Sequence, residues 1–266
     1  MKKNKAAPVA VFDSGVGGIG VLGELQKILP NESFVYFGDS KNAPYGGKKR
    51  EEILELVEQH AARLLKEAKA LVLACNTATA VAAAPLRAKY GDTPIIGMEP
   101  ALKPAFLYAA QQKKGHAPTV LVLATPTTLA EQKFKTQLCR YRRDCRVISL
   151  PAPQLVSLVE AGLAQEVATK SYLKSLLSPY MGANTPDAVV LGCTHFPFAR
   201  DAISAVFGGT VPLFDGAEGT ARETARRLAA ADLLAPAGNT TTPRITLTCS
   251  DESKLPFFRE MLQSTS

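Results

Sequence analysis

The alternation of short apolar segments with segments of helical periodicity constrains the fold of this chain more than any other feature. Residues 9–12, 34–37 and 71–74 are candidate strands, and residues 51–69 repeat apolar side chains along one helical face. This alternation is typical of βαβ units, whose parallel strands are buried on both faces. We therefore predict an α/β fold in which mostly parallel sheets are flanked by helices.

The same rhythm restarts in the second half of the chain. Residues 119–123, 147–150 and 188–191 are candidate strands, and residues 127–141 and 171–181 have helical patterns. In each half, one strand runs directly into a cysteine, Cys75 or Cys193, at nearly the same offset. The sequence therefore predicts two similar α/β halves that arose by duplication.

The C-terminal part contains too few elements to form a third core. It offers strands at 211–214 and 245–249, helices at 219–233 and 254–262, and a loop at 236–243. We expect this part to return to the first half. The expected domains are residues 1–97 with 210–266, which hold Asp13 and Cys75, and residues 98–209, which hold Glu160, Cys193 and His195.

Composition excludes several function classes. The 266 residues include 46% apolar residues, yet no apolar run approaches the roughly 18 residues that span a membrane. Residues 1–7 are basic and lack the apolar stretch of a signal peptide, so we expect a cytoplasmic protein. The net charge of +7 is spread out, and its densest groups, 48–50 and 140–146, have no interleaved aromatic residues. Nucleic-acid binding is therefore not predicted.

The five cysteines are an odd number without a CxxC pair, and the chain has only three histidines. This pattern argues against a structural zinc site, and no metal is predicted. In a reducing compartment the cysteines are free thiols.

Four polar clusters follow predicted strands, where ligands of open parallel sheets bind. They begin at Asp13, Asp39, Cys75 and Cys193. Each has a plain structural alternative. The first lacks both GxGxxG and GxxxxGK[ST] spacing, so Asp13 would simply cap the following helix. The second would be a surface loop, and either cysteine a buried structural thiol.

Two thiols at matching points of two related halves suit one task in particular. Racemisation requires a base on one face of a carbon and an acid on the other, and each must serve in both roles. Asp13 is expected near Cys75, and His195 follows Cys193 closely. Glu160 lies on a predicted helix, where it either orients His195 or is an exposed helix residue.

The segments FDSGVGG, YFGDSKNAPYG, ACNTAT and LGCTHFP occur in this order and resemble those of bacterial glutamate racemases. The resemblance runs from about Val9 to the last helix. It implies two pseudo-symmetric α/β domains with the active site between them, and an isomerase that uses neither pyridoxal phosphate nor a metal. It further implies interconversion of L- and D-glutamate, supply of D-glutamate for peptidoglycan, and a homodimer.

The resemblance also assigns residues. Cys75 and Cys193 match the catalytic thiols, facing the α-proton of D- and L-glutamate respectively. Asp13 and His195 match the assisting acid/base residues, and Glu160 matches the carboxylate near the histidine. The positions that match those holding the substrate are Asp13, Ser14, Pro44, Tyr45, Gly46, Asn76, Thr77, Thr194 and His195.

The sequence departs from the family pattern at Phe196, where a tyrosine is usual, and in the less typical turn VLATPTT. The short N-terminal extension gives little support for regulation by a cell-wall precursor. Aspartate racemases tend to carry Glu where this chain has His195, and a decarboxylase of the superfamily would need only one thiol. A protein that only binds an amino acid would need no opposed thiols. An interaction with gyrase is not predicted.

Overall fold

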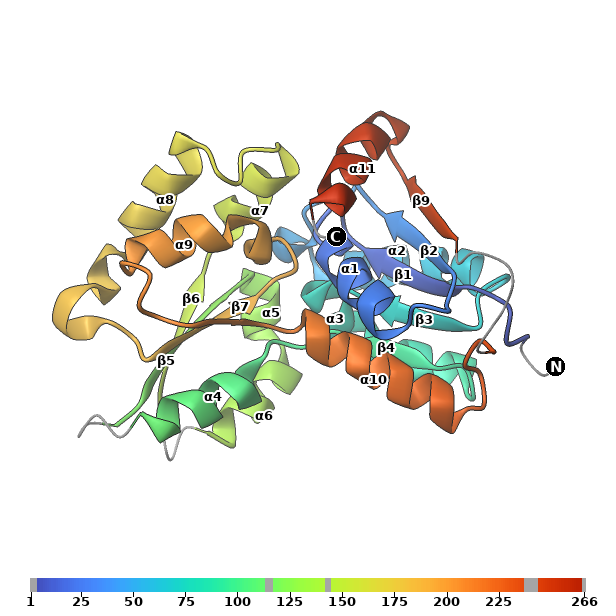
Figure 1. The fold of residues 1–266 in the computed structure, drawn as a ribbon, viewed down its shortest axis with the longest axis horizontal. Helices are drawn as coiled ribbons and strands as arrows, with labels where there is room; N and C mark the ends of the chain where they lie inside the picture. The colour runs from blue at the N-terminus through green and yellow to red at the C-terminus, as the bar shows by residue number, and fades with distance from the viewer. Residues whose placement is uncertain (1–3, 113–116, 142–144, 237–243, 265–266) are drawn as a thin grey trace. The chain divides into compact units, whose positions relative to one another are not determined.

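The computed structural model describes residues 4–112, 117–141, 145–236 and 244–264. The chain forms two compact units: Met1–Glu99 with Ala217–Ser266, and Pro100–Gly216. Each unit is a parallel sheet with helices on both sides, which confirms the predicted α/β class (Figure 1). Most of the predicted loop at 236–243, and the centre of the basic group at 140–146, lie outside the described residues.

The sheet of the first unit has the strand order β4-β3-β1-β2-β9, and all neighbouring strands are parallel. Its inner strands β1 and β3 are buried throughout, which explains their uninterrupted apolar sequence. The strands are β1 Val9–Asp13, β2 Phe34–Gly38, β3 Ala70–Leu73, β4 Ile95–Gly97 and β9 Ile245–Cys249.

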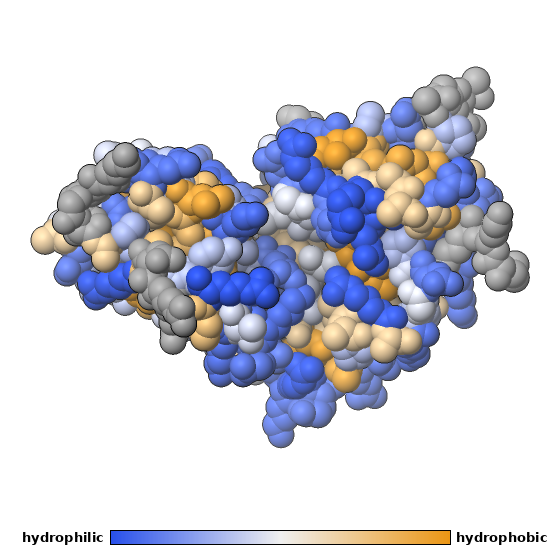
Figure 2. Space-filling model, turned by 90° about the horizontal axis from the view of Figure 1, so that it is seen from below, coloured by the Kyte–Doolittle hydropathy of each residue, from blue (hydrophilic) through white to orange (hydrophobic). Residues whose placement is uncertain are grey.

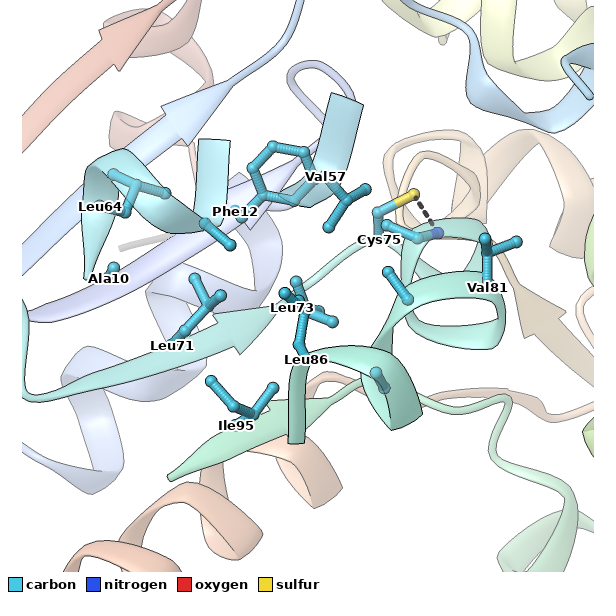
Figure 3. Packing of buried hydrophobic residues seen from close by; sticks show 14 of the residues in the cluster. Ala10, Phe12, Val57, Leu64, Leu71, Leu73, Cys75, Val81, Leu86 and Ile95 are labelled. Carbon is cyan, nitrogen blue, oxygen red and sulfur yellow. Dashed lines mark hydrogen bonds between the residues drawn. The ribbon is translucent and has the colours of Figure 1, made fainter. Parts of the chain in front are cut away.

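Two layers of helices cover this sheet. One core cluster joins α2 and α3 to the strand residues Ala10, Phe12, Leu71 and Leu73 (Figure 3). Helix α1 instead packs against α10 and α11. The helices are α1 Ile19–Ile28, α2 Arg50–Leu64, α3 Asn76–Tyr90, α10 Ala217–Ala230 and α11 Leu255–Gln263, with the 3₁₀ turns η1 Tyr45–Gly47 and η5 Glu252–Lys254.

The second sheet has the order β6-β5-β7-β8 and is also parallel. Alternate residues of β5 face two separate clusters: Leu121 and Leu123 meet α7, α8 and α9, whereas Val120 and Val122 meet α4 and α6. The strands are β5 Thr119–Ala124, β6 Arg146–Pro151, β7 Ala188–Gly192 and β8 Leu213–Asp215. The helices are α4 Leu102–Gln111, α5 Pro126–Ala130, α6 Gln132–Cys139, α7 Pro153–Glu160, α8 Val167–Leu177 and α9 Arg200–Val206, with the 3₁₀ turns η2 Ser178–Tyr180, η3 Gly182–Asn184 and η4 Phe196–Ala199.

The two sheets repeat one topology. The order β4-β3-β1-β2 of the first unit recurs as β8-β7-β5-β6 in the second. Cys75 follows β3 and Cys193 follows β7, so the two cysteines occupy equivalent places in the two repeats. This agrees with the duplication that the sequence indicated.

The structure differs from the sequence-based expectations in several elements. The return to the first unit comes at Ala217 rather than at residue 210, because β8 pairs in parallel with β7. The single helix expected over 127–141 is divided into α5 and α6, since Glu131 has an extended backbone. Helices α4 and α9 were not predicted; Pro104 falls in the first turn of α4, where its missing N–H breaks no helical hydrogen bond.

On the face shown in Figure 2, hydrophilic residues are interspersed with smaller hydrophobic areas. The exposed large hydrophobic residues in the described part of the chain are scattered: Leu107, Leu163, Val167, Met181 and Leu234. None of the described helices is long and apolar enough to cross a membrane.

Candidate active site

Cys75 is the N-cap residue of α3 (Figure 3). Its sulfur accepts a hydrogen bond from the backbone N–H of Ala78 at 3.4 Å, and its thiol donates to the hydroxyl of Ser14 at 3.6 Å. Cys75 is only 5% exposed. The fifteen-residue helix therefore presents its positive end to the sulfur, an arrangement that favours a negative charge there.

Asp13 ends β1 and is fully buried. Its carboxylate accepts the backbone N–H of Gly15 at 2.9 Å, which fixes the turn that carries Ser14. The N-cap of α1 is Gly18, so the alternative in which Asp13 caps that helix is wrong. Gly18 is required for another reason: a Cβ at this position would lie 2.7 Å from the Cβ of Asp13. The backbone turn thus holds Asp13 and Ser14 beside the Cys75 strand end.

The segment after β2 folds around the carboxylate of Asp39. The Tyr45 hydroxyl donates to Asp39 at 2.6 Å, and the Asn42 amide donates to both carboxylate oxygens at 3.0 Å. Burial alone would raise the pKa of Asp39, but hydrogen bonds from His60, Tyr45, Ser250 and Asn42 lower it to about 2. Asp39 is therefore ionised throughout the neutral range.

Tyr45 is buried, and its hydroxyl is committed to Asp39. Burial, followed by the hydrogen bond to this carboxylate, raises the pKa of Tyr45. The phenol therefore stays protonated and supports the loop from within. Pro44 is exposed and Gly46 is buried.

Asn76 is the first residue of α3 and is 3% exposed. Within the described residues, neither its amide oxygen nor its amide nitrogen has a hydrogen-bond partner. A buried amide without partners costs free energy, so this group calls for an explanation, such as a ligand that completes its hydrogen bonds. Thr77, also buried, follows it in the first turn of the helix.

The second unit carries a different arrangement around Cys193. The sulfur of Cys193 lies 3.7 Å from Nδ1 of His195, and the hydroxyl of Thr194 lies 3.4 Å from the same nitrogen. Nε2 of His195 lies 2.5 Å from Oε1 of Glu160, at the end of α7. The Glu160 side chain is only 14% exposed, so the alternative of an exposed helix residue is wrong.

These contacts determine the charge of His195. Burial alone would lower its pKa, but the hydrogen bonds to Cys193 and Glu160, together with their negative charge, raise the pKa well above 6.5. His195 is thus an imidazolium at neutral pH. Nδ1 of the ring faces the sulfur of Cys193 and Nε2 faces the carboxylate of Glu160, so the imidazolium can pass its Nδ1 proton to the sulfur when the sulfur is a thiolate.

The structure brings the predicted residues together within each unit. Asp13, Ser14 and Cys75 lie together in the first unit, and the backbone N–H of Asp39 donates to the carbonyl of Asp13 at 3.0 Å. Cys193, Thr194, His195 and Glu160 lie together in the second. The turn at Thr125 caps α5 and contacts Thr128.

Sequence reasoning missed the interactions of Asp39 and did not single out His60. Asp39 lies within YFGDSKNAPYG, one of the segments that resemble the family, and this position could have marked it as a candidate. His60 lies in an ordinary helical pattern on α2 and had none. In the part of the chain that the structure describes, no group of three or more His, Cys, Asp or Glu side chains is suited to hold a metal ion.

Comparison with known proteins identifies the class. The family model of Asp/Glu/hydantoin racemases matches residues 28–224. The chain is 46% identical over 225 residues to a glutamate racemase of Clostridium perfringens (strain SM101 / Type A), covering 84% of both chains. It is 47% identical over 232 residues to one of Ectopseudomonas mendocina (strain ymp), covering 86% of this chain and 85% of the relative.

Solved structures agree with this likeness. Glutamate racemase from Francisella tularensis in complex with D-glutamate has a TM-score of 0.78 at 28% identity, covering 98% of this chain and 94% of that one. Escherichia coli glutamate racemase in complex with L-glutamate and the activator UDP-MurNAc-ala has a TM-score of 0.80 at 30% identity, covering 96% and 95%.

With its paired parallel sheets and a thiol at the equivalent strand end of each, the chain belongs to the Asp/Glu/hydantoin racemase family. Within that family the high identity over most of the chain places it among the bacterial glutamate racemases. It is an isomerase that interconverts L- and D-glutamate.

Proposed function

We propose that this enzyme racemises glutamate by a two-base mechanism in which Cys75 and Cys193 serve opposite faces of the α-carbon. One thiolate removes the α-proton, and the other thiol returns a proton to the opposite face. The roles exchange when the reaction runs in reverse. The observation that carries the proposal is that buried thiols follow β3 and β7, which occupy equivalent places in the two repeats.

The neighbours of each sulfur support its proposed role. At Cys75, the N-terminus of α3 favours a negative sulfur, and Asp13 and Ser14 are placed to assist. At Cys193, His195 would supply a proton as the imidazolium or accept one as the neutral imidazole, while Glu160 holds the ring in position. By family resemblance, Cys75 faces the α-proton of D-glutamate and Cys193 that of L-glutamate.

The substrate's amino and carboxylate groups are held, in this proposal, by nine residues: Asp13, Ser14, Pro44, Tyr45, Gly46, Asn76, Thr77, Thr194 and His195. The unpartnered amide of Asn76 supports this assignment, because a ligand carboxylate or ammonium group would satisfy it. The N-terminus of α3 likewise suits an anionic group. The proposal requires that both sulfurs reach the same α-carbon of the substrate.

The biological role follows from the product. We infer that the enzyme supplies D-glutamate for peptidoglycan synthesis. The expectations of a homodimer and of a cytoplasmic location, which come from the sequence, remain part of this proposal.

Isotope exchange and single-thiol variants test the mechanism. L-Glutamate incubated in heavy water with the purified enzyme alone is expected to gain deuterium at Cα and to yield the D-enantiomer. Cys75→Ser and Cys193→Ser are each expected to abolish racemisation. Each variant should still eliminate HCl from one enantiomer of a β-chloroglutamate, and the preferred enantiomer should differ between the two.

A variant pair that loses both elimination activities equally would contradict the assignment of one thiol to each face. Cys139→Ser is the matched control, because Cys139 is exposed at the end of α6. This substitution is expected to leave racemisation unchanged. Racemisation that survives loss of either Cys75 or Cys193 would overturn the two-base mechanism.

A further inference from the structure

The helix α2 contributes a histidine to the interior of the loop that follows β2. His60 lies in the last two turns of α2, far from every motif of the sequence. Its Nε2 lies 3.3 Å from Oδ2 of Asp39, and its side chain is 15% exposed. This contact joins the helix to the carboxylate around which residues 39–46 fold.

The carboxylate of Asp39 is the shared contact of the loop that follows β2 and of helix α2. One carboxylate accepts from the Tyr45 hydroxyl and the Asn42 amide in the loop, and faces His60 on α2. Its own backbone N–H donates to the carbonyl of Asp13, which ends the neighbouring strand. The carboxylate is fully buried, so each donor offsets the cost of removing its charge from water.

The His60 ring is itself held in place by aromatic contacts. Its centroid lies 4.6 Å from that of Phe37 and 5.9 Å from that of Phe12, at the ends of β2 and β1. The guanidinium of Arg63, one turn further along α2, lies 4.3 Å from the centroid of Phe37. The ring therefore has little freedom, and its nitrogen is aimed at the Asp39 carboxylate rather than at solvent.

We propose that His60, acting through Asp39 and Tyr45, is a positioning residue that fixes the Pro44–Gly46 segment for binding of the substrate. The inference rests on the proposed function, in which this segment holds the amino and carboxylate groups of glutamate. In this proposal His60 takes no part in proton transfer. Its loss changes how well the loop is preorganised for the ligand, which is a binding effect.

Two substitutions separate the donor of His60 from its packing. His60→Phe keeps an aromatic ring against Phe37 but removes the nitrogen. His60→Gln loses the ring but retains an N–H donor at about the reach of Nε2. For His60→Phe we expect KM to rise roughly tenfold for both glutamate enantiomers, with kcat within about threefold of wild type, the scale of one charge-assisted hydrogen bond. His60→Gln is expected to recover most of that loss.

Arg63→Met is the matched control on the same helix. Arg63 is exposed and contacts the Phe37 ring, but it is not among the donors to Asp39 in the described structure. This variant is expected to keep the wild-type KM. If His60→Phe folds poorly, Tyr45→Phe removes another donor to the same carboxylate and is expected to raise KM in the same way. The effects of the two substitutions combined should be less than multiplicative, because they act through one group.

An unchanged KM in both His60→Phe and Tyr45→Phe would overturn the inference. So would a KM in His60→Gln that is no better than in His60→Phe, because the effect would then come from packing alone. The failure of the proposed function is distinguishable: a Cys75→Ser or Cys193→Ser variant that still racemises glutamate would refute the two-base mechanism, whereas the KM comparison among His60 variants would still stand.

Discussion

The Glu160–His195 pair makes the stability of the second unit depend on pH in a direction that the structure fixes. His195 is 1% exposed, and its Nε2 lies 2.5 Å from Glu160. Glu160→Gln keeps the shape of the side chain but removes the charge that opposes the imidazolium. Removing one partner of a buried charge pair costs about 3–5 kcal/mol. Because the Glu160 side chain is 14% exposed, the lower figure of about 3 kcal/mol is appropriate.

The sign follows from the direction of the pKa shift. The folded-state pKa of His195 lies well above 6.5, the value expected without the fold, so the folded protein binds this proton more tightly than the unfolded chain does. The stabilisation is therefore complete below pH 6.5 and is lost as pH rises through the folded-state pKa. The difference between wild type and Glu160→Gln should be largest in mild acid and should shrink toward alkaline pH.

Urea unfolding at intervals from about pH 6 to about pH 9 measures this difference. A cost of about 3 kcal/mol corresponds to a midpoint lower by roughly 1 M urea at the acid end. Glu166→Gln is the matched control, because it removes the same charge from an exposed position in the same unit. Histidine ring NMR should show that His195 loses its proton at lower pH in Glu160→Gln. A stability difference that stays constant, or that grows with pH, would refute the reasoning.

Two further substitutions test the packing of the first unit. Gly38→Ala places a Cβ 2.5 Å from both the carbonyl oxygen of Gly15 and the ring of Phe258. Overpacking of this kind costs about 1–3 kcal/mol of stability. Thermal melting should therefore show a lower Tm than in the control Gly47→Ala, where the new Cβ meets no atom of the described residues within 4 Å. Lys69→Met leaves the buried Glu32 carboxylate without its ammonium partner and is expected to cost about 3–5 kcal/mol in denaturant unfolding. Lys48→Met, which breaks the more exposed pair with Glu52, should cost less than about 1 kcal/mol, and similar losses in the two lysine variants would contradict this account.

Local patterns were sufficient to predict the strands and the polar clusters that follow them. The central strands are buried on both faces, so their apolar runs stand out against the amphipathic helices. Cys75 and Cys193 end up at equivalent strand ends because the duplicated halves keep one strand order. Asp13 and Ser14 were predictable for the same reason, since Asp13 ends β1 and Ser14 directly follows it.

The remaining features depend on contacts between residues that are distant in sequence. Helical periodicity continues across Glu131, yet the backbone extends there and separates α5 from α6. The short strand β8 has no pattern that selects a partner, and only its pairing with β7 assigns it to the second unit. His60 meets Asp39 because α2 packs beside the β2 strand end, which no local motif encodes.

Thermodynamics limits how the different surroundings of the two sulfurs can affect the kinetics under the proposed mechanism. Cys75 has a helix N-terminus and the Ser14 hydroxyl, whereas Cys193 has an imidazolium paired with Glu160. L- and D-glutamate have equal free energies in water, so kcat/KM must be equal in the two directions at every pH. We call each sulfur with its neighbouring residues a half-site. A change at one half-site, such as the loss of Glu160, therefore lowers kcat/KM by the same factor for both enantiomers. The asymmetry of the half-sites can be expressed only in how each direction divides that factor between kcat and KM, because the two enzyme–substrate complexes leave a different sulfur charged.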